Sequence, residues 1–257
     1  MNIYIADSYK DYTAFTAKHI LHFLEKKQER KEKLYISVSS EYDTKDIYNA
    51  IAENVKNYKI NFKNIFIFQQ SEYMGIDPND KNSKAYFLKE NLISKLNIPE
   101  ENAFLFDGTK DETQMDKQQE IINKIGRFDV IWYSLTADST SAGNERMSSL
   151  STLFRVKTLS EHSINEIKDR FEDKNKVPTT VFSMGMGFID IVDTVLLTSS
   201  GIEKSCSLRD CLEHGISNSS PLSKLQKHSD VTVIADYESS LRLSSQTVFM
   251  KIQKNIK

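Results

Sequence analysis

The fold of this chain can be inferred outward from one stretch, residues 65–80, which reads IFIFQQSEYMGIDPND. Its apolar start, residues 65–68, stops abruptly at polar residues, and a glycine and a proline then turn the chain. A short apolar run that ends in this way is typical of a buried strand in a parallel sheet. Open sheets of this kind carry their functional side chains in loops at the carboxyl ends of the strands. The turn after residue 68 is therefore a predicted site, with Ser71 and Glu72 at its tip.

The same alternation of apolar run and turn recurs along the whole chain. Further strands are expected at residues 3–6, 34–38, 103–106, 130–134, 180–184, 195–197 and 231–234. Helical patterns lie between them, at residues 12–25, 46–57, 84–96, 112–125 and 204–213. Strands that alternate with helices predict an α/β fold: a three-layer, open, mainly parallel twisted sheet with helices on both faces. The sequence has no repeat and no Pro/Gly-rich linker, so a single domain over residues 1–257 is expected.

The composition limits the classes of partner. The chain has 34 basic and 36 acidic residues and a formal net charge of −2, so it does not indicate the clustered basic face that binds nucleic acid. No segment approaches the roughly 18 uninterrupted apolar residues of a membrane helix, and the N-terminus lacks a signal-peptide pattern. None of the five histidines has metal-ligand spacing, so no metal and no cofactor are expected. We expect a soluble, cytoplasmic protein with no membrane or nucleic-acid partner.

Three loops at predicted strand ends carry most of the candidate site residues: 39–43, 69–80 and 136–147. In and around them stand, in chain order, the motifs SEYMGI (71–76), FLFDGT (104–109), DSTSAGNE (138–145), SSLSTLFRVKTL (148–159), RFEDKNKVP (170–178), SMGMG (183–187) and TSSGIEK (198–204). This series resembles the glucosamine-6-phosphate deaminase (isomerase) family, to which the 6-phosphogluconolactonases are related. The resemblance spans nearly the whole chain and implies a Rossmann-like, glucosamine-6-phosphate deaminase-like fold.

At two proton-handling positions, this chain has other residues than the resemblance implies. Enzymes of the family isomerise and deaminate an aminosugar phosphate, with an aspartate at the position of Ser71 and a histidine at the position of Thr140. The lactonases use the same histidine position to hydrolyse a lactone. A serine hydroxyl needs an activating base before it can accept a proton from carbon, and threonine has no group that titrates near pH 7. Asp138 and Glu145 match the family, where they support the histidine.

The resemblance further implies a set of residues that bind the substrate phosphate: Ser39, Ser40, Arg170 and Lys204. In the family, a Gly/Thr/Pro-rich loop at residues 39–43 cradles the phosphate with its backbone N–H groups. Here the same loop contains Glu41 and Asp43. Each of these carboxylates would repel a phosphate charge about 5 Å away by roughly 3 kcal/mol. The acids must therefore point away, or the anion is not bound there.

Two further features belong to the resemblance. The first is a match to the family's second phosphate site, which is allosteric in its hexameric members: Ser148, Arg155, Lys157 and Thr158. The same run is also a structural element where no allostery operates, so both interpretations stay open. The second is bulk at Trp132 and Tyr133, where the family has small residues. These two side chains are expected to narrow the substrate cleft.

Three hypotheses for function follow. The first is a divergent pseudoenzyme, degenerate for the family reaction, that binds a sugar phosphate or similar anion. It would act in sensing or regulation, as a homo-oligomer or with an active relative. The second is an active aminosugar-phosphate isomerase or deaminase, or a related phosphosugar enzyme, that uses Asp138, Glu145 or Glu72 as acid and base. The third is a structural or interaction module without a ligand.

Overall fold

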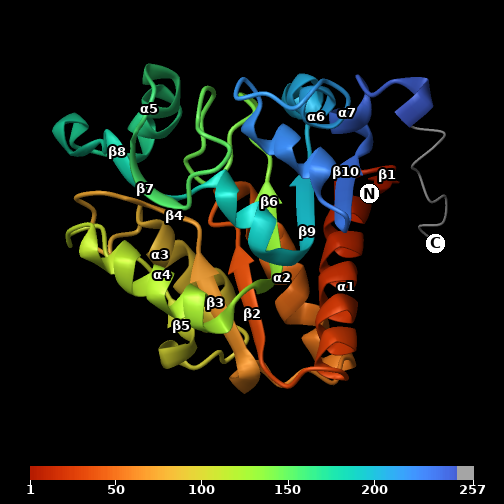
Figure 1. Cartoon of the computed structure of the whole chain (residues 1–257), viewed down its shortest axis with the longest axis horizontal. Helices are drawn as coiled ribbons and strands as arrows, with labels where there is room; N and C mark the ends of the chain where they lie inside the picture. The colour runs from red at the N-terminus through yellow and green to blue at the C-terminus, as the bar shows by residue number, and fades with distance from the viewer. Residues whose placement is uncertain (248–257) are drawn as a thin grey trace.

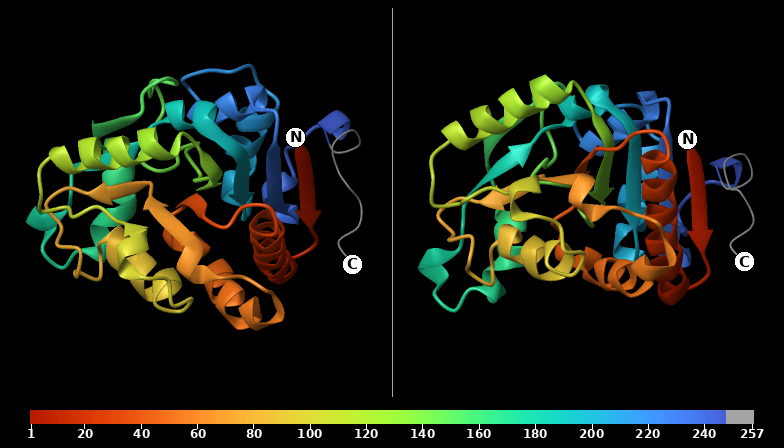
Figure 2. Two further views of the ribbon diagram at one scale, coloured as in Figure 1. Left: turned by 60° about the horizontal axis from the view of Figure 1, so that its bottom comes forward. Right: turned by 90° about the horizontal axis from the view of Figure 1, so that it is seen from below.

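The computed structural model describes residues 1–247 and shows a layered α/β architecture (Figure 1). Its main sheet has seven strands. In spatial order they are β1 (Asn2–Ala6), β10 (Val231–Asp236), β9 (Val192–Ser199), β6 (Phe128–Ser134), β2 (Leu34–Val38), β3 (Ile65–Gln69) and β5 (Ala103–Phe104). All neighbouring strands run parallel, which confirms the predicted α/β fold. The N-terminal strand β1 lies beside β10 at one end of the sheet (Figures 1 and 2).

Helices cover both faces of this sheet. The helices are α1 (Tyr9–Gln28), α2 (Lys45–Asn54), α3 (Lys84–Leu88), α4 (Thr113–Ile125), α5 (Glu161–Ile167), α6 (Ser205–Leu212) and α7 (Tyr237–Ser240). Of these, α5 does not pack on this sheet, because its buried Ile167 lies in a separate cluster with Tyr73 and Val181. Figure 2 shows α1 and α2 on one side of the sheet and α4 on the other. Buried apolar residues of α1, α2 and α3 share one cluster, whereas Ile122 of α4 and the buried apolar residues of α6 belong to a second. Because both faces of the sheet are covered, its strands read as nearly continuous apolar runs.

Short segments of tighter or wider helix complete the connections. The 3₁₀ segments are Tyr42–Thr44, Val55–Asn57, Phe62–Asn64, Glu100–Asn102, Lys168–Arg170, Lys174–Lys176, Met186–Ile191, Ile202–Lys204 and Pro221–Lys227. A π-helical turn, Lys89–Ile93, continues α3. The predicted helix at residues 84–96 therefore begins at the right residue but is divided between two helical geometries.

Helix α1 illustrates how the local sequence specifies an element. The Ser8 hydroxyl caps its N-terminus by accepting a hydrogen bond from the Asp11 backbone N–H at 3.1 Å. Its buried residues Tyr12, Leu21 and Leu24 recur at intervals close to the helical repeat, so they share one face. The structure extends this helix beyond the predicted range 12–25 at both ends, where the residues are polar and carry no apolar signal.

A second, antiparallel sheet corrects one strand prediction. Residues 180–184 were expected in the parallel sheet, but they form β8 (Thr180–Met184), the central strand of a three-stranded sheet with β4 (Ser71–Tyr73) and β7 (Phe154–Thr158). The backbone of residues 152–153 crosses the end of β8 so closely that a Cβ on Gly185 would lie 2.2 Å from the Thr152 carbonyl oxygen. Sequence patterns give the strand itself, but not the partner with which it pairs.

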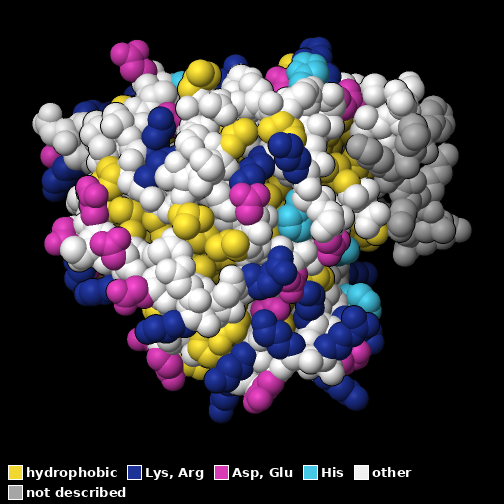
Figure 3. All heavy atoms as spheres, viewed as in Figure 1, with side chains coloured by type: hydrophobic (Ala, Val, Ile, Leu, Met, Phe, Trp, Pro, Cys, Tyr) yellow, Lys and Arg dark blue, Asp and Glu magenta, His cyan; other side chains and the backbone are white. Residues whose placement is uncertain are grey.

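Two further observations bear on the predictions for the whole chain. Within residues 1–247, no helix is both long and apolar enough to cross a membrane. Basic and acidic side chains are interspersed on the face drawn in Figure 3, unlike the clustered basic face that nucleic acid requires. The single domain over residues 1–257 stays a prediction, and its last part, residues 248–257, lies outside the described residues.

Candidate functional site

A cleft of about 400 Å³ lies at the carboxyl ends of the strands. It collects side chains from segments far apart in the sequence: the loop after β2, the residues after β6, helix α5 and the start of α6. Its charged lining residues are Glu41, Asp43, Lys84, Glu145, Glu166, Arg170, Glu203 and Lys204. Figure 1 shows β2, β6 and β9 directed toward this edge of the sheet. A strand-end cleft of this kind is where open α/β sheets bind ligands.

The loop after β6 has an unusual backbone. Three of its non-glycine residues, Ser139, Ala142 and Met147, have positive φ angles of 68°, 55° and 65°. Such conformations each cost on the order of 1–3 kcal/mol and persist only where the surroundings enforce them, which is most often at functional sites. A compact hydrogen-bond network enforces part of this loop: Asp138 Oδ1 accepts from the Thr136 hydroxyl at 2.5 Å and from the Thr140 hydroxyl at 2.8 Å.

Glu145 lies in the cleft wall, where backbone and side-chain donors engage its carboxylate. The Ser160 backbone N–H donates to both of its oxygens at 2.9 and 3.0 Å, and the Ser160 hydroxyl donates to Oε1 at 3.1 Å. Ser160 is the N-cap of α5. Glu145 therefore connects the loop after β6 to the start of α5.

Ser71 and Glu72 occupy the turn predicted as the site, but both are fully buried and neither lines the cleft. Glu72 accepts five hydrogen bonds at the N-terminus of α3, from the backbone N–H groups of Tyr73, Lys84 and Ala85 and from the side chains of Ser83 and Gln69. A carboxylate in this position stabilises the helix start and is fully occupied. Ser71 Oγ accepts a hydrogen bond from Lys84 Nζ at 3.1 Å.

The four residues expected to bind phosphate divide into two groups. Lys204 and Arg170 line the cleft. Ser39 and Ser40 are buried beside it: Ser39 Oγ accepts from the Glu41 backbone N–H at 3.2 Å, and Ser40 Oγ donates to the Ser71 carbonyl at 3.5 Å. Their hydroxyls thus serve the protein backbone.

Both acids of the loop after β2 point toward cations, Glu41 toward Lys84 and Asp43 toward Lys204. The Lys204 ammonium group forms an ion pair with the Asp43 carboxylate, which also accepts hydrogen bonds from the Ser134 hydroxyl at 2.9 and 3.0 Å. The guanidinium carbon of Arg170 lies 4.1 Å from the centroid of the Tyr42 ring. The sequence left two options: either Glu41 and Asp43 point away from the cleft, or no anion is bound at this loop. Both carboxylates line the cleft, so the first option is wrong.

Lys84 is a site residue that the sequence reasoning missed. It is only 4% exposed, and its Nζ donates to Glu41 Oε1 at 2.8 Å. Burial by itself would lower the pKa of Lys84, but the Glu41 carboxylate and the Tyr73 hydroxyl outweigh this and raise it above its usual range. A signal was available, because a lysine directly after the N-cap Ser83 is disfavoured by the helix dipole and needs another reason to be there.

The cleft as a whole is acidic, since five carboxylates face three cations. Burial raises the pKa of Glu166, and the Asp138 carboxylate adds to this effect. The cations Lys84 and Lys204 are already paired with Glu41 and Asp43. The arrangement therefore offers an external anion much less positive potential than its lysines and arginine suggest.

The second candidate phosphate site lies on β7 and the loop before it. Arg155 Nη2 donates to Asn144 Oδ1 at 2.6 Å, and burial lowers the pKa of the guanidinium group. Among the described residues, Arg155 Nη1 and Ser148 Oγ are buried without a hydrogen-bond partner. Arg155 and Lys157 share one face of β7, and Thr158 lies on the other. Neither of the open interpretations of this site is decided by these contacts.

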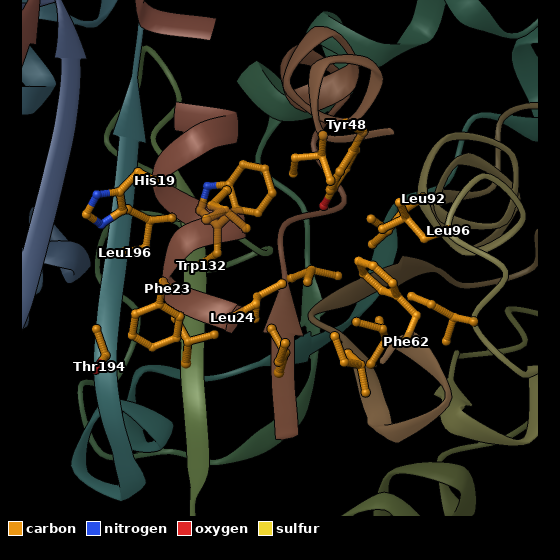
Figure 4. A pocket seen from close by; sticks show the side chains of 18 of the residues that line it. His19, Phe23, Leu24, Tyr48, Phe62, Leu92, Leu96, Trp132, Thr194 and Leu196 are labelled. Atoms are coloured by element: carbon orange, nitrogen blue, oxygen red, sulfur yellow. The ribbon is translucent and has the colours of Figure 1, made fainter. Parts of the chain in front are cut away.

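Trp132 and Tyr133 do not narrow the cleft, contrary to the expectation. The Trp132 ring packs edge-on against Tyr48 with centroids 5.1 Å apart, and its Nε1 donates to Thr198 Oγ1 at 2.9 Å. Figure 4 shows it in an apolar pocket between the sheet and the helices. Tyr133 is fully buried in the apolar cluster of the opposite face. Strand β6 continues to Ser134, so both residues lie within the strand and alternate between its two helix layers.

Comparisons with known proteins found similar sequences and similar structures. No family model matches the chain. It is 29% identical over 238 residues to glucosamine-6-phosphate deaminase from Dictyostelium discoideum, which covers 91% of this chain and 89% of that protein. It is 28% identical over 252 residues to the enzyme of the same name from Borreliella burgdorferi, which covers 96% and 94%.

Two solved structures share the fold. The first is a monomeric glucosamine-6-phosphate deaminase described as a missing link of the NagB superfamily, with a TM-score of 0.87, 22% identity and coverage of 94% of this chain and 100% of that chain. The second is 6-phosphogluconolactonase from Thermotoga maritima, with a TM-score of 0.74, 18% identity and coverage of 91% and 98%. These similarities confirm the resemblance inferred from the motifs: the chain is a homologue of the glucosamine-6-phosphate deaminases and shares its fold with the 6-phosphogluconolactonases.

Proposed function

We propose that this protein keeps the cleft of the deaminase family as a ligand-binding site and does not catalyse the family reaction. One observation carries the proposal: Ser71 and Thr140 stand at the two positions that the resemblance assigns to proton transfer. Ser71 is fully buried, and Thr140 is held by the hydroxyl–carboxylate network of its own loop. A cytoplasmic location is part of the proposal, in keeping with the family resemblance.

Within residues 1–247, no group in hydrogen-bond contact with the Ser71 hydroxyl supplies the missing base. The titratable group in contact with its hydroxyl is the Lys84 ammonium. Because the Glu41 carboxylate and the Tyr73 hydroxyl raise the pKa of Lys84 against the effect of burial, this amine stays protonated at neutral pH and cannot accept a proton. Ser71 is thereby limited to hydrogen bonding.

The alternative of carboxylate catalysis is less well supported by the contacts. Glu72 is buried away from the cleft with five donors around it, and Glu145 is engaged by Ser160. Asp138 accepts from Thr136 and Thr140. A general acid or base must reach the substrate proton, and each of these groups would first have to leave its present partners.

The ligand that we propose is a sugar phosphate or similar anion, as the resemblance implies. Arg170 supports this part, because no ion pair holds it within residues 1–247 and its guanidinium group lies at the cleft over Tyr42. The role would be sensing or regulation, with a second copy of the chain or an active relative as the partner. Lys204 contributes only where the ligand can compete with Asp43.

Two measurements on the purified protein test the proposal. Ammonia release from glucosamine 6-phosphate is expected to stay at background, and turnover at ordinary enzyme rates would refute the catalytic part. Thermal unfolding against a panel of hexose and hexosamine 6-phosphates is expected to show a saturable rise in Tm. A ligand at a hundredfold over its Kd adds about 2.7 kcal/mol, which is several degrees for a chain of this size.

The matched variant is Arg170→Ala, which removes the unpaired cation from the rim of the cleft. It should abolish the ligand-dependent rise without changing the Tm of the free protein by much, because Arg170 is exposed. No rise with any sugar phosphate would refute the anion part of the proposal and favour a structural or interaction module.

A further inference from the structure

The segment after β2 presents two carboxylates to two buried lysines. Glu41 Oε1 lies 2.8 Å from Lys84 Nζ, and the Asp43 carboxylate is paired with Lys204. The lysines come from different elements, the first turn of α3 and the N-cap of α6. They are 4% and 7% exposed, so neither ammonium group can be solvated fully by water.

A buried ammonium group requires an anion or a full set of acceptors, because loss of its hydration is costly. Lys84 has the Glu41 carboxylate and the Ser71 hydroxyl. Asp43 is the one carboxylate paired with Lys204 among the described residues. In the free protein, the segment thus supplies internally the negative charge that a phosphate ligand would otherwise bring.

The fold holds these carboxylates in place. The Ser39 hydroxyl fixes the Glu41 backbone N–H, and the Ser134 hydroxyl donates to both oxygens of Asp43. Tyr42, between them, donates from its hydroxyl to the Asn82 carbonyl at 2.9 Å. These contacts fix the position of the segment at the cleft. That position places Glu41 and Asp43 next to the two lysines.

An external anion that enters the cleft finds both lysines already paired with carboxylates. At Lys204 it must displace Asp43 or accept its repulsion, and Glu203, Glu145 and Glu166 add negative charge around the same cavity. Uncharged groups such as hydroxyls face no such barrier, because they can donate to the carboxylates and accept from the lysines without disturbing either pair.

We propose that Glu41 and Asp43 are specificity-determining residues that act as internal counter-anions, so that a phosphate group binds this cleft only by displacing them from Lys84 and Lys204. The inference rests on the proposed ligand-binding function of the cleft and specifies which residues limit its affinity for phosphate. A sugar phosphate therefore binds in competition with the segment, and its hydroxyl groups can bind without displacing either carboxylate.

Inorganic phosphate is the probe that tests this inference, measured by isothermal titration calorimetry at fixed ionic strength. Asp43→Asn keeps the shape and the hydrogen bond to Ser134 but removes the charge, and it is expected to bind phosphate at least about tenfold more tightly than the unmodified protein. Adding Lys204→Met to Asp43→Asn should abolish the gain. The matched control is Asp46→Asn, because Asp46 accepts a hydrogen bond from the Tyr9 hydroxyl and pairs with neither lysine.

Three results would overturn the inference: a folded Asp43→Asn variant that binds phosphate no more tightly, a gain that survives Lys204→Met, or an equal gain in Asp46→Asn. If Asp43→Asn does not fold without phosphate, the same phosphate titration of Glu41→Gln tests the inference, and an unchanged phosphate affinity in that variant would overturn it. Ammonia release by the unmodified protein would refute the proposed function without affecting this titration. The two failures are therefore distinguishable.

Discussion

Two of the hollows in the described part of the molecule have opposite chemistry, and they differ in the residues that form them. The apolar pocket, a cavity of about 60 Å³, lies between the main sheet and helices α1 and α2 and is lined by side chains such as Phe23, Tyr48 and Trp132 (Figure 4). The charged cleft, about 400 Å³, lies at the strand ends and is lined by eight ionisable Asp, Glu, Lys and Arg side chains. Only the charge of the cleft depends on particular pairs of residues, Glu41 with Lys84 and Asp43 with Lys204.

Their energetics differ for the same reason. An apolar wall is stabilised by the area it removes from water, so side chains of similar volume can replace one another at modest cost. A buried ion pair is not replaceable one partner at a time, because the remaining charge is left without compensation. Substitutions in the two hollows should therefore follow different rules.

The largest effect is expected from Trp132→Ala in the wall of the apolar pocket. Trp132 is 3% exposed, and its loss removes the contact with Tyr48 and enlarges the cavity, so the free energy of unfolding should fall by about 3–5 kcal/mol. Urea unfolding followed by circular dichroism measures this. Tyr237→Ala is the control, because Tyr237 is 57% exposed and its loss should change stability by less than about 0.5 kcal/mol. A loss below about 1 kcal/mol at Trp132 would mean that the pocket wall relaxes freely.

The next largest effect is expected in the charged cleft, where Glu41→Gln should destabilise more than Lys84→Met. Glu41→Gln leaves the Lys84 ammonium group buried without its partner and should cost about 3 kcal/mol. Lys84→Met removes the buried charge itself, while Glu41 can turn toward solvent. Equal losses in the two variants, measured by the same unfolding experiment, would contradict the view that an uncompensated charge dominates here.

A smaller, stabilising effect is expected from filling the apolar pocket with Val130→Ile. Val130 lines the pocket, so one additional buried methylene should raise the free energy of unfolding by about 0.8 kcal/mol. The control is Val195→Ile, at a fully buried position that does not line the pocket, where overpacking should lower stability. If both variants lose stability, the pocket cannot accommodate the added methylene group of Val130→Ile.

The smallest effect concerns His19, the ionisable residue at the edge of the apolar pocket. Burial lowers the pKa of His19, His22 adds to this effect, and Asp230 opposes it. The unfolded chain therefore binds the proton more readily than the folded protein, and stability should be full above the usual pKa of about 6.5 and decrease as the pH falls below it. His19→Phe should flatten this pH dependence of unfolding between pH 7.5 and 5.5, and His22→Gln should alter it less. An unchanged slope in His19→Phe would show that other groups cause it.

The candidate site was only partly predictable from the sequence. Strand ends located the three loops, and the family resemblance gave Lys204, which lines the cleft at the start of α6. Glu72 belonged to the same predicted turn, yet it faces the start of α3, because adjacent side chains of β4 point to opposite sides. Lys84 was missed: its position after the N-cap Ser83 signals only that it needs a partner, and nothing near it in sequence identifies Glu41 as that partner.

The sequence by itself determined the seven strands of the main sheet and the helices α1, α2, α3, α4 and α6, whereas β4, β7, α5 and α7 were not predicted. Apolar runs with turns at their ends specify the strands, as at β2, whose observed bounds equal the predicted ones, and spacing of apolar residues specifies helices such as α1. Both signals arise within one element, so they need no knowledge of the rest of the chain.

Only the tertiary structure decided which residues meet. It paired β8 with β4 and β7, turned Trp132 toward the helices, and joined Asp43 to Lys204 across 161 positions of sequence. The physical reason is that periodicity determines which side chains are buried, whereas strand order and register determine which neighbours they are buried against. The charge that the cleft presents to a ligand depends on that second choice.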